Sequence, residues 1–392
     1  MRNFVSVGLL GLLVMGNALY AQDAVLASYE RNFLRASLGT KVNILTDAPS
    51  DELASEFIGE LYEFALGFSL QNADLLRNDP DFINLTILAS RGAGASGHTD
   101  SVNTLWSVFS SFLDAAIRVE ALGALAVLAT GNTSILENIN QFAASQNSLF
   151  RSGVVPDLKT LSACISALRV LGDRSSVPVL YEVMRSGYDE SITAEAAEAL
   201  EALSSEHHQY LISVIQWKSP VEKLEAFTIA VNNEKFSDDE RGDLVEIALE
   251  VALDGAGERD ADLDTMRYEA VKVLRELEWS RAAALVIRHY YRVQQDYGEG
   301  KAPKEQVVEA IACMGAMASS EAAQVLALHL GYLNSLMEQN GAFDAPVTLG
   351  TVSALGDIGD KIAFDYLLYV SYLPYPERIL NAAKGALGRL KW

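Results

Sequence analysis

The sequence predicts an all-α protein built as an α-solenoid, a row of stacked αα-hairpins. The stretch Val307–Leu330 shows the pattern: Ala310, Met314 and Met317 share one helical face, and a second apolar stripe follows a polar break. The motif within it returns along the chain, and no segment shows the sustained period-2 alternation of a strand. Because two amphipathic helices cannot bury their faces alone, each hairpin needs neighbours.

Residues 1–21 have the pattern of a secretory signal peptide. Arg2 precedes the apolar run Phe4–Met15, and the small residue Ala21 closes the segment. We expect export, cleavage near Ala21, and a periplasmic or secreted protein. Leu19 stands where a small residue is commonest, so an uncleaved N-terminal anchor is the alternative.

The next segments are expected to lead into the repeats. Residues 22–49 predict an N-terminal helix followed by a linker, Gly39–Pro49. Residues 50–97 predict capping helices, the first of them begun by Ser50, because a terminal repeat must solvate its outer side. Residues 98–392 are expected to form the repeat solenoid.

The repeated motif is a small residue followed, four and seven positions later, by two larger apolar ones. The small residue lets a neighbouring helix approach, and the larger ones fill the groove beyond it. Successive copies begin 32 to 43 residues apart, except for one interval of 74 that contains a degraded copy at Ala226. The other copies begin at Ala121, Cys164, Ala196, Ala270, Ala310, Thr351 and Ala383.

Two of these units resemble known repeats. Ala167–Asp173 followed by Val177–Leu180 resembles a HEAT repeat, and Ala354–Asp360 followed by Ala363 and Leu367 resembles the variant seen in phycobilisome-lyase-type HEAT repeats. The resemblance covers roughly residues 101–392. It implies a right-handed solenoid of the armadillo type that binds other proteins on its concave surface. The family shares no catalytic residues, and nothing in this sequence marks a bilin site.

Charge restricts the partners. The chain carries a formal net charge of −22 at pH 7. Such a surface repels phosphate backbones and anionic lipids, so nucleic acid and membrane surfaces are poor partners, whereas basic proteins or divalent cations fit. The same charge also keeps a repetitive helical surface soluble. The two cysteines, Cys164 and Cys313, sit in apolar stripes and are expected to be buried free thiols.

Two segments match functional motifs only in part. Gly92–Gly97 fits a dinucleotide fingerprint, but no second strand follows, so we expect a flexible turn between the cap and the first regular unit. Asp260–Asp264 resembles the opening of a calcium loop, but Thr265 and Val271 stand where an EF-hand needs Gly and Glu. We expect a solvated acidic loop there, with Asp264 or Thr265 capping the next helix.

Aromatic residues offer the candidate protein-contact sites. Four tyrosines recur every third residue near one helical stripe, and a second group combines arginines with tyrosines. Core packing explains both groups equally well. The candidate residues are Tyr366, Tyr369, Tyr372 and Tyr375, and Arg288, His289, Tyr290, Tyr291 and Arg292.

No catalytic, cofactor or metal site is predicted. The five histidines are scattered, the adjacent His207 and His208 point to different helix faces, and His329 on an apolar stripe is expected to be a hydrogen-bonded core residue. The leading hypothesis is therefore an exported, non-enzymatic scaffold that binds a protein or peptide in the cell envelope. The alternatives are a ligand-binding protein or enzyme with a site in the solenoid groove, and a structural envelope component.

Overall fold

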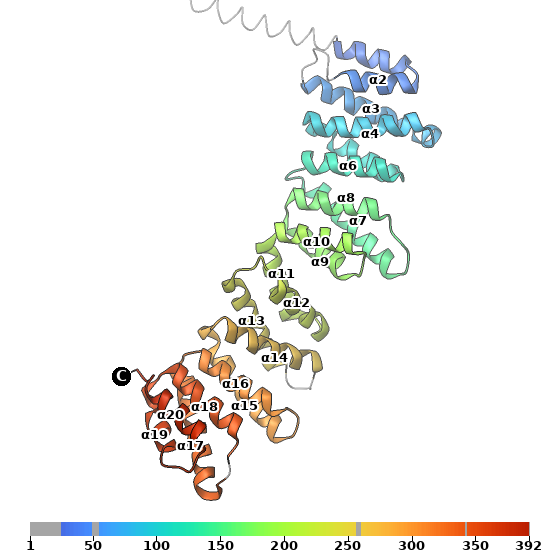
Figure 1. The fold of residues 1–392 in the computed structure, drawn as a ribbon. Coiled ribbons are helices and arrows are strands. Elements are labelled where there is room, and N and C mark those ends of the chain that lie inside the picture. The colour runs from blue at the N-terminus through green and yellow to red at the C-terminus, as the bar shows by residue number, and fades with distance from the viewer. Residues whose placement is uncertain (1–24, 49–54, 256–259, 342, 392) are drawn as a thin grey trace, which may run out of the picture. The chain divides into compact units, whose positions relative to one another are not determined.

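The structure is a computed structural model that describes residues 25–48, 55–255, 260–341 and 343–391. These residues are mainly helical (Figure 1), and among them the one β-type pairing is an isolated bridge between Asp360 and Lys391. The predicted all-α class is confirmed. The signal segment 1–21 and the predicted cap Ser50 lie outside the described residues.

The chain divides into two compact units, Met1–His207 and His208–Trp392. The boundary falls within α11 (Ser204–Trp217). Neighbouring helices pack in succession within each unit. No helix in the described part of the chain is both long and apolar enough to cross a bilayer.

In the first unit, five helices pack one on the next in a row (Figure 1). The row consists of α2 (Leu38–Asp47), α4 (Pro80–Ser96), α6 (Ala115–Leu128), α8 (Leu158–Leu171) and α10 (Glu190–Ala202). Beside it, α3 packs on α5 and α7 on α9. These helices are α3 (Ser55–Leu76), α5 (Val102–Ser111), α7 (Thr133–Arg151) and α9 (Val177–Arg185).

The second unit has two complete rows. The first row consists of α12 (Pro220–Asn232), α14 (Ala261–Glu276), α16 (Lys304–Ala316), α18 (Ala345–Ile358) and α20 (Glu377–Leu387). The second row consists of α13 (Asp238–Asp254), α15 (Ala283–Gly298), α17 (Ser320–Asn340) and α19 (Phe364–Val370). Each second-row helix also packs on the first-row helix that follows it in the chain.

The repeated motif forms the core of the helices that carry it. The first residue of every copy is at most 1% exposed, as expected for a position where a neighbouring helix approaches. The degraded copy is real: α12 carries Ala226 and Ala230, both buried, and occupies the interval of 74 residues. The capping boxes at Ser219 and Ser237 begin α12 and α13.

The glycine cluster Gly92–Gly97 is not the flexible turn that the sequence predicted. Gly92 and Gly94 lie inside α4, and only Gly97 ends that helix, with a left-handed φ of 73°. A Cβ at Gly92 would overlap the Tyr62 ring, and one at Gly94 would lie 2.9 Å from the Ala124 Cα. These two glycines therefore permit close packing of helices.

The prediction that Gly39–Pro49 is a linker is also wrong for residues 39–48, the described part of this range. Residues 38–47 form α2, which Ser37 begins by accepting a hydrogen bond from the Thr40 backbone N–H. Leu45 is buried, and the Lys41 ammonium donates to the carbonyl of Ala36. Tertiary burial overrides the weak helical preference of a stretch that holds Gly39 and Thr40.

Candidate functional site

The four tyrosines predicted as one stripe are separated by the end of a short helix. Because α19 ends at Val370, Tyr366 and Tyr369 lie on it, whereas Tyr372 and Tyr375 follow it. The chain turns at Ser371 and Tyr372 instead of continuing as a helix. The single stripe is therefore wrong, and the four side chains have different surroundings.

Tyr375 belongs to the core, and Tyr366 is partly covered. The Tyr375 hydroxyl donates to Asn334 Oδ1 at 3.2 Å, and the Asn334 amide donates to the Tyr366 carbonyl at 3.2 Å. The Tyr375 ring meets Phe343 edge to face, with 5.8 Å between the ring centroids. Burial raises the pKa of Tyr375 to about 12. Tyr366 is half-buried over Gly331.

The group at residues 288–292 is divided in the same way. Tyr290 and His289 are buried, and Tyr291 is exposed. Arg288 forms an ion pair with Asp254 at 2.6 Å, and Arg292 pairs with the buried Asp296 at 3.5 Å. Tyr291 is thus the member of this group that offers apolar contact area.

A hollow of about 240 Å³ lies between α15 and α17, beside Tyr291. Its lining mixes aromatic, aliphatic and polar side chains, namely Tyr290, Tyr291, Gln294, Val325, Leu328, His329 and Tyr332. The hydrogen-bonded His329 that the sequence predicted is not found, since its Nδ1 has no partner among the described residues. Burial lowers the pKa of His329 to about 4, so the ring is neutral at pH 7.

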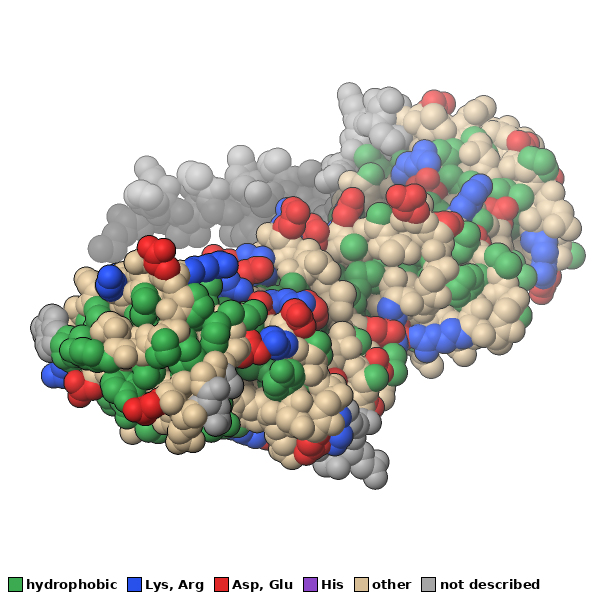
Figure 2. Space-filling model, turned by 60° about the horizontal axis from the view of Figure 1, so that its bottom comes forward, with side chains coloured by type: hydrophobic (Ala, Val, Ile, Leu, Met, Phe, Trp, Pro, Cys, Tyr) green, Lys and Arg blue, Asp and Glu red, His purple; other side chains and the backbone are tan. Residues whose placement is uncertain are grey.

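Exposed apolar side chains gather on successive second-row helices and the turn after α19. We call this group the aromatic surface. Its members, with exposed fractions, are Tyr291 (54%), Leu328 (57%), Tyr332 (60%), Tyr369 (40%) and Tyr372 (73%). Figure 2 shows hydrophobic side chains gathered on the face of the second unit that is turned toward the viewer, with charged side chains along its edges.

Leu328 and Tyr332 are members of the aromatic surface that were not predicted from the sequence. A signal was present, because both residues are large and apolar yet fall off the buried stripe of α17, which runs through Leu326 and Leu330. Their spacing of four places them one helical turn apart on the same side. Tyr369, by contrast, was predicted, and its hydroxyl donates to Glu338 on α17 at 2.9 Å.

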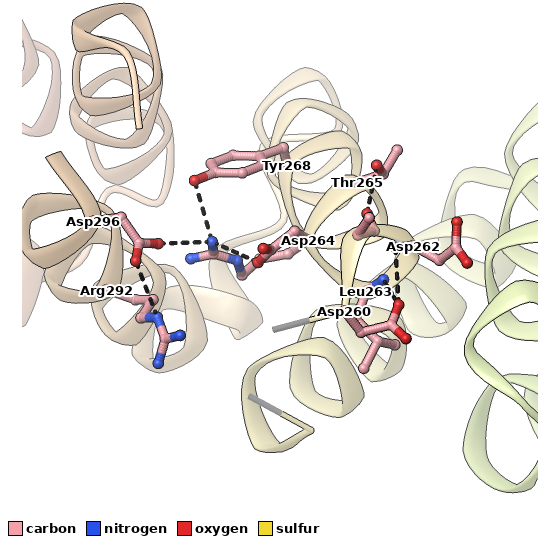
Figure 3. Close-up of polar contacts among 10 residues, drawn as sticks. Asp260, Asp262, Leu263, Asp264, Thr265, Tyr268, Arg292 and Asp296 are labelled. Atoms are coloured by element: carbon pink, nitrogen blue, oxygen red, sulfur yellow. Dashed lines mark hydrogen bonds and ion pairs between the residues drawn. The ribbon is translucent and has the colours of Figure 1, made fainter. Parts of the chain in front are cut away.

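The acidic segment at Asp260 begins a helix four residues earlier than predicted. Asp260, not Asp264 or Thr265, is the cap: its carboxylate accepts from the backbone N–H groups of Asp262 and Leu263 (Figure 3). The remaining acidic residues then lie in the first turn of α14, where the helix dipole favours them. In the described residues no three His, Cys, Asp or Glu side chains converge as a metal site.

Beneath this helix start lies a buried ion network. Arg267 is 2% exposed, and its Nη2 donates to Asp264 at 3.0 Å, Asp296 at 3.1 Å and the Tyr268 hydroxyl at 3.2 Å (Figure 3). Asp296 also pairs with Arg292. Two arginines and two aspartates compensate one another, as a buried guanidinium requires.

The cysteines are buried thiols, as predicted. Desolvation raises the pKa of Cys313 to about 12, and it raises the pKa of Cys164 as well. The Cys313 thiol donates to the Val271 carbonyl at 3.3 Å. Neither thiol has the depressed pKa of a nucleophile.

Comparison with known proteins assigns this chain to no family. No protein-family model matches it, and no curated protein matches it. Among solved structures, an engineered protein determined by the Northeast Structural Genomics Consortium aligns over 89% of this chain and 98% of its own, with 15% sequence identity and a TM-score of 0.35. A similarity at that TM-score supports no argument about fold or function.

Proposed function

We propose that this protein is an exported, non-enzymatic scaffold that binds a protein partner on the aromatic surface. Its stacked hairpins would form a right-handed, HEAT-like solenoid of the armadillo type, and residues 1–21 would direct export and be removed. The succession of packed helices within each unit supports the solenoid, because each hairpin shares its apolar faces with its neighbours.

The observation that carries the proposal is the aromatic surface itself. Tyrosine is enriched at protein interfaces, since its ring offers a large contact area and its hydroxyl a polar tip. Tyr291 and Tyr332 border a hollow of about 240 Å³, which can receive a side chain of a partner. Isolated exposed apolar residues need no explanation, but a group on adjacent helices indicates contact with another molecule.

The partner is expected to combine an apolar anchor with positive charge. Glu338 accepts from Tyr369 at the edge of the aromatic surface, and the whole chain carries a net charge of −22. Complementary charge speeds the encounter and excludes acidic competitors. Nucleic acid and anionic membranes remain poor candidates on the same ground.

Binding should depend on the hollow. In pull-downs from cell-envelope extract, Tyr291→Ser/Tyr332→Ser should recover much less of any partner that the unaltered protein retains. Loss of a central aromatic anchor costs about 2 kcal/mol, or roughly 30-fold in affinity. Leu75→Ser in the first unit, which replaces an 85% exposed leucine, is the control. Equal recovery by all three proteins would contradict the proposal.

Export is tested separately. The protein isolated from the periplasm or medium should begin near Gln22 when its N-terminus is sequenced. A protein recovered only from the cytoplasm with Met1 intact would refute the export proposal, and would leave the binding surface to be judged by the pull-down.

A further inference from the structure

A second pocket lies in the first row of the second unit, between α14 and α16. Its volume is about 400 Å³, within the range of small-ligand sites. One side chain from α15, His289, also lines it. The full lining is Thr265, Tyr268, Glu269, Val271, Lys272, His289, Glu305, Gln306 and Glu309.

The pocket is rich in hydrogen-bond acceptors and negative charge. Three glutamates line it against one lysine. Glu269 pairs with Lys272 at 2.7 Å, and Glu309 pairs with Arg275 at 2.8 Å. Glu305 has no ion-pair partner within the described chain, so its carboxylate is available to a cation.

Two buried polar atoms of the pocket residues lack partners. His289 is 1% exposed, and neither its Nδ1 nor the Gln306 Oε1 has a hydrogen-bond partner among the described residues. Leaving such groups unpaired costs about 1–3 kcal/mol each. Burial, with the nearby charge of Arg267, lowers the pKa of His289 to about 3. The imidazole is therefore neutral at pH 7 and does not repel a cation.

The ion network described above fixes one wall of the pocket. Arg267 donates to the Tyr268 hydroxyl and lies with its guanidinium carbon 4.6 Å from the Tyr268 ring centroid. Asp264 and Asp296 are the ion-pair partners of Arg267 in this wall. The Tyr268 ring is thus held in place before any ligand arrives.

We propose that this pocket binds an alkylammonium group, supplied by a free amine or by a lysine side chain. An ammonium has three donors and no acceptor, which matches a site that offers unpaired acceptors. Glu305 supplies the compensating charge, and Gln306 Oε1 supplies a neutral acceptor. His289 Nδ1 supplies another in the tautomer that carries the proton on Nε2, and Val271 contacts the alkyl chain. The site uses none of the residues of the aromatic surface, so the proposal does not depend on that function.

The test is calorimetric titration of the full-length mature protein with two amines and their uncharged analogues. The probes are 1,5-diaminopentane, with 1-pentanol as its control, and acetyl-Gly-Lys-Gly-amide, with the norleucine peptide as its control. Glu305→Gln removes the free carboxylate of the pocket. Glu321→Gln removes an exposed carboxylate at the start of α17, outside the pocket, and is the matched variant.

Saturable one-site binding of either amine, about tenfold weaker in Glu305→Gln and unchanged in Glu321→Gln, supports the proposal. Binding of the diamine identifies a free amine as the source, and binding of the peptide alone identifies a lysine side chain. Non-saturable binding, equal weakening by both variants, or equal binding of the uncharged analogues would show only general attraction to an acidic protein and overturn the proposal.

Discussion

Arg267 is a buried charge of the second unit. Its guanidinium is buried against Asp296, which is also buried. Asp296→Ala would leave Arg267 without its buried counter-ion and should lower the free energy of unfolding by about 3–5 kcal/mol. Asp254→Ala, which breaks an exposed pair with Arg288, should cost less than about 1 kcal/mol. Urea titrations compare the two, and equal losses would contradict the assigned role of Arg267.

His289 should make the second unit sensitive to acid. Its folded pKa of about 3 lies below the ordinary value of 6.5, so between these values the unfolded chain binds a proton that the folded chain does not. Stability therefore falls as the pH drops below 6.5, by about 2 kcal/mol at pH 5. In urea unfolding at pH 7 and pH 5, the free energy of unfolding of His289→Gln should not show this drop of about 2 kcal/mol. An identical pH dependence in both proteins would show that His289 is not buried as described.

Single tyrosines show why the candidate site could be predicted only in part. For the tyrosines at 366–375, the sequence pattern favours a surface position and a core position equally. The structure places Tyr375 in the core and Tyr372 on the surface because α19 ends between Tyr369 and Tyr372. The end of α19 has no local signal in the sequence. The hydrogen bond from the Tyr375 hydroxyl to Asn334 Oδ1 has none either, because the two residues are 41 positions apart.

At the scale of elements, glycines set how closely helices approach. A Cβ at Gly94 would lie 2.9 Å from the Ala124 Cα, whereas one at Gly123 in the exposed face of α6 would meet nothing. Gly94→Ala should therefore destabilise the first unit by about 1–2 kcal/mol through overpacking. Gly123→Ala should stabilise it by about 0.5–1 kcal/mol through helix propensity. Thermal unfolding of both variants shows whether each substitution raises or lowers stability. If both raise it, the close contact between Gly94 and Ala124 is refuted.

Helices of the regular repeat could be predicted because the small and large positions recur at helical spacing. The residues at which helices begin were harder to predict from the sequence. Asp260, Asp262 and Asp264 are all good caps, and local sequence does not decide which of them precedes the first turn. α2 was missed because Gly39 and Thr40 weaken its propensity, and the burial of Leu45 that compensates is a property of the folded unit.

At the scale of the molecule, the two cysteines report on the two units separately. Cys164 lies in the first unit and Cys313 in the second, and both are buried with raised pKa values. Maleimide should label each only when its own unit opens. Asp296→Ala should accelerate labelling of Cys313, and Gly94→Ala that of Cys164, as read by peptide mass spectrometry. Equal acceleration of both thiols by either variant would mean that the chain unfolds as one cooperative body.

Composition and repeats predicted the architecture of both units better than the location of the site. The motif even indicated a hidden unit in the interval of 74 residues, which α12 and α13 fill. The aromatic surface could not be assembled from sequence, because it joins Tyr291, Tyr332 and Tyr369 from three helices that become neighbours only through packing.

The proposed contact between the aromatic surface and a partner protein can be tested in the cell. The most direct measurement is photo-crosslinking in living cells with p-benzoylphenylalanine in place of Leu328, or in place of Leu75, which is more exposed, as the control. We expect one defined crosslinked protein from position 328, absent at position 75 and lost when Tyr291→Ser and Tyr332→Ser are added. No crosslink at position 328, or the same products from both positions, would contradict the account.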